Sequence, residues 1–585
     1  MQLNSSQMEA VTADQARVCV VASPGSGKTT VVVERIRHML HTLQVIPSHI
    51  HALTFTRLAA NQFAARLGRD AQGLGFIGTV HAYCLQLVMQ HGQAIGYDPA
   101  WLRLIGDGEN CADEMQALVD LGYCRQAKTG KTKWVKCKAG EWHTYKDQVL
   151  AGKMHPGDWP DLQPAWDGFM GNLRNQNTLT YSSLLYETSR LLSLSNVLAA
   201  VCRTHQHILV DEFQDTDPQQ WQIISSIVGG QQASTLMVVG DPDQSIYAWR
   251  GADPAIMLEF ANRPSVHLVQ LRECYRYGQD IANASCSLID HNTGRLQQPV
   301  VALGPCGSVT VQEDAEQPSR LLELCASHKP RDVAVLCRMH APLHKIQQLL
   351  EAQGVPCLKL GTLHALKQTA EWQACVGLLR LSINPADRLA FMAAACALGL
   401  DADGLHRVRA TAARHRSSLW HAWAGRGPSQ QGTRQPPSTV AALADFLAGA
   451  QGSNYASSLM HLAHVDHAQG STDTQALLNY LAYASVQDEL QGAQDGDGSV
   501  TLATMHAAKG LQWPVVILIG MTQGICPSQS AVRKGSMEED RRLCFVGMTR
   551  AQKSLHLVSW DCNYTQAPAS QFIEEAGLTG ALIME

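Results

Sequence analysis

RVCVVASPGSGKTTVVVE, residues Arg17 to Glu34, is the stretch that decides the fold of the chain's first part. Its short, β-branched run from Val18 to Ala22 predicts a buried strand that ends at Ser23-Pro24-Gly25. A glycine-rich loop follows, and a helix is predicted from about Thr29 to Met39. Strand, loop and helix in this order place successive backbone N–H groups around an anion at a helix N-terminus. The stretch therefore predicts a binding site for a nucleoside triphosphate.

The loop residues have separate chemical roles in this prediction. Gly25 and Gly27 let the backbone approach phosphate, Lys28 reaches the β- and γ-phosphates, and the Thr29 hydroxyl ligates Mg²⁺. Ala22 stands where the general P-loop pattern has its first glycine, so the sequence departs from that pattern at one position. A chance turn is the alternative, and the flanking strand and helix argue against it. The residues expected to contact the nucleotide here are Ala22, Ser23, Pro24, Gly25, Ser26, Gly27, Lys28, Thr29, Thr30 and Arg35.

Length and composition indicate a folded protein of several domains. The chain has 585 residues, whereas single cores rarely grow beyond about 250–300 residues. Its 45% apolar and 17% charged residues are typical of a soluble protein. No apolar run approaches the roughly 18 residues of a membrane span, and the N-terminus lacks a signal-peptide pattern. We therefore expect a cytoplasmic protein, of bacterial or phage type, with no membrane partner.

Cysteine usage and net charge limit the chemistry further. The 17 cysteines are scattered with no CxxC pair, which indicates neither a zinc ribbon nor a disulfide framework. The net charge of −5 does not favour a nucleic-acid partner. It does not exclude one, because affinity depends on local basic grooves.

Two later segments place aromatic or polar residues near a strand end. Residues 49–55 predict a strand, and Phe55 at its end either stacks on a nucleobase or joins the core. Thr79 and His81 begin a predicted helix, where a hydroxyl and an imidazole can meet phosphate. Residues 172–192 are predicted to be helical.

An acidic pair follows the predicted strand His207 to Val210. Asp211 would hold the Mg²⁺ shell, and Glu212 would orient and deprotonate the attacking water. A chance Asp-Glu pair after four apolar residues is common, so this motif indicates a nucleotide site only together with the other motifs.

A further predicted strand, Thr235 to Val239, leads into the loop GDPDQSIYAWRGA. Gln244 in this loop is placed to face a γ-phosphate, and Trp249 with Arg250 to face a nucleobase. One loop would then couple the nucleotide state to polymer binding.

A basic segment lies between residues 125 and 153. Eight Lys or Arg residues stand there against two acidic ones, with Trp134, Trp142 and Tyr145 interleaved. Basic residues with aromatics suit a nucleic-acid contact. A solvated, mobile loop is the equal alternative.

Taken together, these motifs resemble those of a UvrD/Rep-type superfamily-one DNA helicase, in family order. The resembling segments are Leu3-Asn4 with Gln7, ASPGSGKT (22–29), ALTFTRLAA (52–60), GTVHAYC (78–84), VDEFQDTD (210–217), VGDPDQSIYAWRGA (239–252), LRECYR (271–276), VTLATMHAAKGLQWPVV (500–516) and EEDRRLCFVGMTRAQ (538–552). The resemblance implies an α/β fold with two RecA-like parallel-sheet P-loop motor domains, each carrying a mainly helical insertion. ATP would bind in the cleft between them.

The resemblance also implies domain bounds. The first motor domain would comprise 1–90 and 186–270, with a basic insertion at 91–185. The second would comprise 271–380 and 495–585, with a short helical insertion at 381–494.

Residue roles follow by motif position. Tyr275 would stack on adenine, and Gln7 would read its edge; an N-cap at Asn4 or Ser5 is the other role of that segment. Gly510 and Gln512 would contact the nucleotide, although Gln512 stands where the family usually has a Glu that contacts the sugar. The implied catalytic residues are Lys28, Asp211, Glu212, Gln244, Arg276 and Arg550, with Thr29 and Asp211 as Mg²⁺ ligands. The implied DNA contacts are Phe55, Thr56, Thr79, His81, Tyr247, Trp249, Arg250 and His506.

The implied activity is an ATP-dependent 3′–5′ DNA helicase or translocase. It would act on single-stranded and partially duplex DNA in repair, replication or recombination. The alternative is a motor subunit or ATP-sensing partner of a nuclease, in a repair or phage-defence complex, with little unwinding of its own. Two departures from the family pattern, Cys274 and Tyr181-Ser182-Ser183, leave the catalytic set intact.

Overall fold

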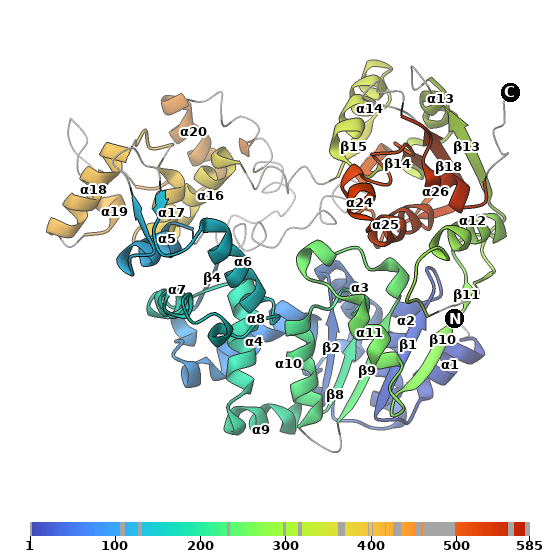
Figure 1. Cartoon of the computed structure of the whole chain (residues 1–585), viewed down its shortest axis with the longest axis horizontal. Helices are drawn as coiled ribbons and strands as arrows, with labels where there is room; N and C mark the ends of the chain where they lie inside the picture. The colour runs from blue at the N-terminus through green and yellow to red at the C-terminus, as the bar shows by residue number, and fades with distance from the viewer. Residues whose placement is uncertain are drawn as a thin grey trace. The chain divides into compact units, whose positions relative to one another are not determined.

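The computed structural model describes most of the chain in two compact units. The described residues are 3–105, 111–126, 132–230, 234–296, 300–313, 319–360, 369–395, 397–400, 402–415, 417–424, 435–451, 455, 458–459, 462, 498–559 and 567–578. Unit 1 contains Met1–Ser327, Asp332–Pro342 and Ala508–Glu585, and unit 2 contains His328–Arg331 and Leu343–Ala507. Figure 1 labels many of the elements of both units.

Unit 1 begins with a parallel sheet of six strands in the order β10-β1-β9-β8-β2-β3. The strands are β1 (Arg17–Ala22), β2 (Ile50–Thr54), β3 (Phe76–Thr79), β8 (His207–Val210), β9 (Thr235–Gly240) and β10 (His267–Leu271). Its helices are α1 (Ser5–Thr12), α2 (Lys28–Arg37), α3 (Arg57–Leu67), α4 (Val80–His91), α8 (Tyr181–Leu192), α9 (Ser195–Thr204), α10 (Pro218–Gly229) and α11 (Pro254–Ala261). The strands predicted around β1, β2, β8 and β9 are confirmed, with bounds that differ by up to one residue at either end.

Helices cover both faces of this sheet, because successive strand residues point to opposite sides. Along β1, Cys19 and Val21 pack into one core with α4, α8 and α10. Val18 and Val20 pack into a second core with α1, α2 and α3. The ends of the parallel strands at Ala22, Val210 and Gly240 therefore bring their loops to one edge of the sheet.

The segment predicted as the first insertion, 91–185, has a core of its own in unit 1. Its elements are β4 (Arg103–Ile105), α5 (Cys111–Asp120), β5 (Cys124–Gln126), β6 (Thr132–Trp134), α6 (Ala139–Leu150), α7 (Gln163–Asn175) and β7 (Thr178–Thr180). Trp142 and Tyr145 are fully buried among α5, α6 and α7. The nucleic-acid interpretation is therefore wrong for these two rings, which form a packed core.

Two other expectations for this region also change. The helix predicted over 172–192 is interrupted, because β7 lies between α7 and α8 and pairs with β4. Lys146, one of the counted basic residues, forms a partly buried ion pair with Glu114 at 2.7 Å. Lys128 and Lys131 lie outside the described residues.

The second parallel sheet has the order β13-β18-β17-β14-β16-β15. Its elements in unit 1 are β13 (Ser308–Glu313), β14 (Val333–Cys337), β17 (Trp513–Ile519) and β18 (Ala551–Ser559), with α12 (Gln279–Ile289), α13 (Ser319–Ser327), α24 (Gln529–Lys534), α25 (Glu538–Met548) and α26 (Gln571–Glu575). A short parallel pair, β11 (Glu273–Cys274) and β12 (Val301–Ala302), precedes it. The fold is α/β with two six-stranded parallel sheets, which confirms the parallel-sheet α/β fold that the family resemblance implies.

Unit 2 is mainly helical. Its elements are β15 (Cys357–Lys359), α16 (Ala370–Ile383), α17 (Arg388–Ala394), α18 (Ala402–His415), α19 (Leu419–Ala424), α20 (Val440–Gln451) and β16 (Val500–Thr504). Helix α14 (His340–Ala352) belongs to unit 2 from Leu343 onward. Trp372, Phe391 and Trp420 anchor one apolar core. Because Trp372 lies on α16, this core includes residues before position 381.

Candidate nucleotide and DNA site

The glycine-rich loop of unit 1 adopts the backbone that phosphate binding requires. Gly25 and Gly27 have φ of +76° and +87°, in the left-handed region that favours glycine. Helix α2 begins at Lys28, directly after Gly27. The Lys28 ammonium donates to the carbonyl oxygen of Ala22 at 3.2 Å, across the loop. The N-terminus of α2 and one cation therefore meet at the carboxyl end of β1.

The segment Cys274–Arg276 lies directly on this loop. The backbone N–H of Tyr275 donates to the carbonyl oxygen of Gly25 at 3.1 Å. A Cβ at Gly25 would stand 2.6 Å from Cβ of Arg276 and 3.0 Å from Sγ of Cys274. Glycine is therefore required at position 25 by close approach as well as by its φ.

Residues expected to hold the base gather beside the same loop. The side-chain amide of Gln7 donates to the carbonyl oxygen of Ser26 at 3.0 Å. Asn4 caps α1, as one reading of this segment expected, and its amide donates to the Tyr275 hydroxyl at 3.0 Å. The Tyr275 side chain is 42% exposed, which leaves ring surface for an adenine to stack on.

Two carboxylates, Asp211 and Glu212, directly follow β8 at the same edge of the sheet. Burial, together with the neighbouring Glu212, raises the pKa of Asp211. Burial alone would raise the pKa of Glu212, but the cations Lys28 and Lys509 lower it below its ordinary value. Glu212 has φ of +53°, a strained conformation for a residue with a side chain. Glu212 is therefore held ionised, as a group that accepts a proton from water must be.

The site has the chemistry of a Mg²⁺ position. Oδ1 of Asp211 is buried and has no hydrogen-bond partner among the described residues. An orphaned carboxylate oxygen is costly unless something fills its coordination. Thr29 follows Lys28 in the first turn of α2, at the end of the helix that the glycine-rich loop precedes. Oxygen donors of this kind fit Mg²⁺.

Two arginines enter the site from segments far apart in sequence. Arg550 is almost completely buried and donates to Oε1 of Gln244 at 3.1 Å. Arg276 donates to the carbonyl oxygen of Thr549 at 2.9 Å, while its Nε is buried without a partner among the described residues. Burial and the neighbouring Arg276 lower the pKa of Arg550 to about 9. Because the charge of Arg276 disfavours that of Arg550, an anion bound beside both groups would be favourable.

Lys509 is a site residue that the sequence interpretation missed. Its ammonium forms a buried ion pair with Asp215 and donates to the carbonyl oxygen of Gln244 at 2.8 Å. The same nitrogen lies 4.8 Å from the centre of the Tyr247 ring. The sequence could have indicated Lys509, because it stands just before Gly510 in VTLATMHAAKGLQWPVV, one of the segments that resemble the helicase family.

Aromatic rings continue from Tyr247 to an exposed surface. Phe55 stacks on Tyr247 with ring centres 5.2 Å apart and planes inclined by 19°. Trp249 is 63% exposed, and the Arg250 guanidinium lies 4.6 Å from its ring centre. Phe55 thus packs on a neighbouring ring, whereas Trp249 and Arg250 present a stacking face to solvent.

Other predicted residues occupy different surroundings. Thr56 and Thr79 cap α3 and α4 by accepting from Ala59 and Ala82, each at 3.2 Å. The guanidinium of Arg35 donates to the carbonyl oxygen of Val11 at 2.8 Å, which fastens α2 to α1.

Of the remaining residues predicted to contact DNA or nucleotide, His81, Gly510 and Gln512 lie in unit 1 and His506 lies in unit 2. The His81 ring lies 6.0 Å from that of Tyr181, centre to centre. Gly510 and Gln512 are exposed in unit 1, and Leu511 between them accepts from Arg550 at 3.3 Å.

Comparisons with known proteins agree over most of the chain. Residues 3–265 match the family of the UvrD/REP helicase N-terminal domain, and residues 453–561 match the UvrD-like helicase C-terminal domain. The chain is 27% identical to the ATP-dependent DNA helicase PcrA of Leuconostoc citreum, over 95% of this chain and 82% of that protein. It is 27% identical to DNA helicase II of Escherichia coli K12, over 95% of this chain and 84% of that protein. It is 26% identical to the ATP-dependent DNA helicase PcrA of Bacillus subtilis, over 95% of this chain and 82% of that protein.

Among the residues that the structure describes, none of the helices has the length and apolar character needed to span a membrane.

Proposed function

Since the chain belongs to the UvrD-like helicase family, we infer that it is an ATP-dependent DNA helicase that couples ATP hydrolysis to movement on single-stranded DNA. One observation carries this inference within unit 1. Buried Arg550 reaches Gln244, beside Arg276 and the Lys28 loop. Cations from three separate segments thus surround the place where the γ-phosphate of ATP would lie.

The hydrolysis roles follow from this geometry. Lys28 and the N-terminus of α2 hold the phosphates, and Tyr275 with Gln7 holds the base. Glu212 orients water and takes its proton, because the surrounding cations keep it ionised. Arg276 and Arg550 stabilise the charge that spreads over the transferred phosphoryl oxygens. When bound, Mg²⁺ would neutralise phosphate charge from a position held by Thr29 and Asp211.

The DNA roles rest on the loop that follows β9. Gln244 contacts Arg550, while Trp249 and Arg250, a few residues further on, face solvent. A change at the phosphate therefore reaches the stacking residues through a short, partly buried loop. Bases stack on exposed aromatic rings without sequence preference, which suits a motor that moves along a strand.

The finer assignments are part of the same proposal. We propose 3′–5′ polarity, the two motor domains at 1–90 with 186–270 and at 271–380 with 495–585, and insertions at 91–185 and 381–494. We also propose a role in DNA repair, with a repair factor or nuclease as a possible protein partner. The alternative of an ATP-sensing subunit with little unwinding is not favoured, because the similarity to named helicases extends over 95% of the chain.

Strand displacement with matched substrates tests this function. Purified protein would be given 3′-tailed, 5′-tailed and blunt DNA duplexes, with ATP hydrolysis recorded in the same reactions. We expect single-stranded DNA to stimulate hydrolysis and only the 3′-tailed duplex to be unwound. Hydrolysis with no displacement of any substrate would contradict the helicase assignment.

Active-site variants then test the residue roles. Lys28→Ala and Glu212→Gln should each lower stimulated turnover by about 100-fold or more, because charge neutralisation or water activation is lost. Lys534→Ala is the matched control, since Lys534 is exposed at the end of α24. Unchanged turnover in either site variant would refute its assigned role.

A further inference from the structure

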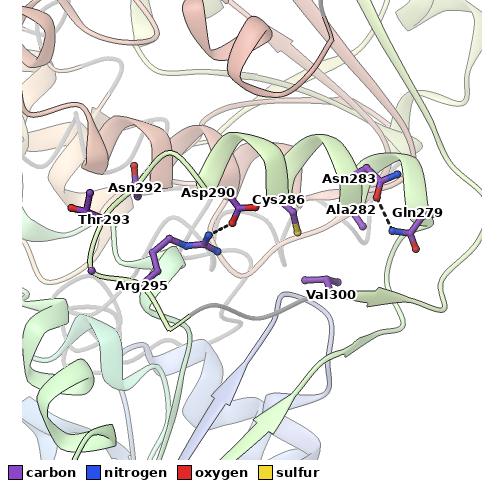
Figure 2. Close-up of a pocket in the computed structure, with 10 residues that line it drawn as sticks. Gln279, Ala282, Asn283, Cys286, Asp290, Asn292, Thr293, Arg295 and Val300 are labelled. Atoms are coloured by element: carbon purple, nitrogen blue, oxygen red, sulfur yellow. Dashed lines mark hydrogen bonds and ion pairs between the residues drawn. The ribbon is translucent and has the colours of Figure 1, made fainter.

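A polar pocket of about 740 Å³ lies beneath helix α12 in unit 1. Gln279, Asn283 and Cys286 line it from the helix, and Arg295 lines it from the segment that follows (Figure 2). Figure 2 shows the Arg295 side chain running along the pocket toward Asp290 at the end of α12. None of the roles assigned above uses Arg295.

Arg295 joins two carboxylates in a single geometry. Its Nε donates to Oδ1 of Asp243 at 2.9 Å and its Nη2 donates to Oδ2 at 2.7 Å, a two-pronged contact. Its Nη1 forms an ion pair with Asp290. The Arg295 side chain is 10% exposed, and that of Asp243 is 16% exposed. Such a paired guanidinium–carboxylate contact fixes direction as well as distance, which a lysine cannot reproduce.

Asp243 is the residue directly before Gln244, in the short turn Pro242–Gln244. Its backbone N–H donates to Oδ1 of Asp241 at 3.1 Å, and Oδ2 of Asp241 accepts from the Gln244 amide. The turn is therefore one hydrogen-bonded piece. A displacement of Asp243 must move the Gln244 amide that faces Arg550.

Arg295 connects this turn to the other side of the nucleotide site. Helix α12 begins at Gln279, three residues after Arg276, and ends beside Asp290. Through Asp243 and Asp290, Arg295 ties the Gln244 turn to the helix that continues the Tyr275–Arg276 segment. Both partners of Arg295 are carboxylates outside the Lys28 loop, so we expect the contact to act on the positions of these groups and not on the nucleotide itself.

We propose that Arg295 is a positioning residue for ATP hydrolysis, whose paired contact with Asp243 sets the distance between Gln244 and the arginines that face the γ-phosphate. This inference rests on the proposed function, because it assigns Gln244 and both arginines to hydrolysis. The distances between these groups matter most in the transition state of hydrolysis. Loss of the Arg295 contact should therefore lower stabilisation of the transition state more than it lowers ATP binding.

The test compares steady-state ATP hydrolysis, with saturating single-stranded DNA, of the wild type, two single variants, their double variant and a control variant. Arg295→Lys and Asp243→Asn should each lower kcat by about tenfold and change KM for ATP less than about twofold, because misplaced groups lose catalysis before binding. The double variant should be no slower than the slower single variant, because both changes remove one contact. Arg295→Lys keeps the charge, so a loss reports the lost geometry.

Arg541→Lys is the matched control. Arg541 makes a comparable two-pronged contact with Glu575, at 2.7 and 2.9 Å, that joins α25 to α26. The Arg541→Lys variant should leave kcat and KM unchanged. Thermal unfolding should show that all variants are folded at the assay temperature.

Three outcomes would overturn the proposal: unchanged kcat in both Arg295→Lys and Asp243→Asn, multiplicative losses in the double variant, or an equal loss in Arg541→Lys. A wild-type protein that hydrolyses no ATP with any DNA strand would instead overturn the proposed function, and this inference with it.

Discussion

The ammonium of Lys509 lies 4.8 Å from the centre of the Tyr247 ring and forms an ion pair with buried Asp215. One side chain therefore contacts both the acidic segment after β8 and the aromatic loop that leads to Trp249. Burial alone would lower the pKa of Lys509, but Asp215 and Glu212 raise it above its ordinary value. Lys509 stays charged and can transmit a change at either place to the other.

Replacement of Lys509 by Met should uncouple hydrolysis from DNA. We expect DNA stimulation of ATP turnover to fall by about tenfold, on the scale of one lost positioning contact. The variant should also lose stability by about 3–5 kcal/mol, because Asp215 is left buried without its partner.

The double variant Asp215→Asn with Lys509→Met separates the two effects. It should recover most of the lost stability in chemical denaturation, because no charge remains unpaired, without recovering the stimulation. Recovery of both would mean that Lys509 serves stability alone.

Replacement of Gly25 by Ala should weaken nucleotide binding. An alanine there must adopt a φ of +76° with its Cβ 2.6 Å from Cβ of Arg276, so the loop or the Arg276 segment must move. Titration with a fluorescent ATP analogue should show affinity reduced by about tenfold or more, equivalent to about 1.4 kcal/mol.

Gly171→Ala is the control for this change. Gly171 lies in helix α7, and an added Cβ would have open space around it apart from the helix's own backbone. That variant should bind the analogue normally and should be slightly more stable, because alanine favours helix. Normal analogue binding by Gly25→Ala would contradict the loop assignment.

Replacement of Trp249 by Ala should weaken binding to single-stranded DNA. The expected loss is about 1–3 kcal/mol, the usual contribution of one base stacked on an aromatic ring. Fluorescence anisotropy of a labelled oligothymidine measures it, and ATP affinity should stay unchanged. Trp159→Ala is the control, since Trp159 is 36% exposed in the first insertion. Equal DNA affinity of wild type and Trp249→Ala would remove Trp249 from the DNA interface.

Acid should destabilise the first sheet through His51. The His51 ring is buried and stacks on His205 with centres 4.0 Å apart. Burial, with the nearby His205, lowers the pKa of His51 to about 3, against about 6.5 in an unfolded chain. Because the unfolded state binds the proton first, stability is complete above pH 6.5 and declines as pH falls toward 3.

From His51 alone we expect the free energy of unfolding to drop by about 2 kcal/mol between pH 7.5 and pH 5. Urea unfolding at both pH values measures this drop. In His51→Leu the drop should be smaller by about that amount, whereas His41→Leu, which changes an exposed ring near Asp70, should keep it. An identical pH dependence in His51→Leu would contradict the shifted pKa.

The sequence by itself determined the local parts of this protein. The run from Val18 to Ala22 has few alternatives to a buried strand, and the Gly25–Thr29 loop carries its phosphate chemistry in its own residues. The order of the motifs was sufficient to indicate the family, because each motif is a short segment whose backbone geometry is set locally.

Only the tertiary structure decided which distant residues meet. Arg550 and Gln244 are 306 positions apart, and no periodicity relates them. Trp142 and Tyr145 stood in a basic segment that suited nucleic acid, yet they are buried, because the helices of the insertion pack around them. Lys509 and Arg295 gained their roles from the carboxylates that the fold places beside them. Burial and close approach depend on the whole chain, so a linear pattern does not contain them.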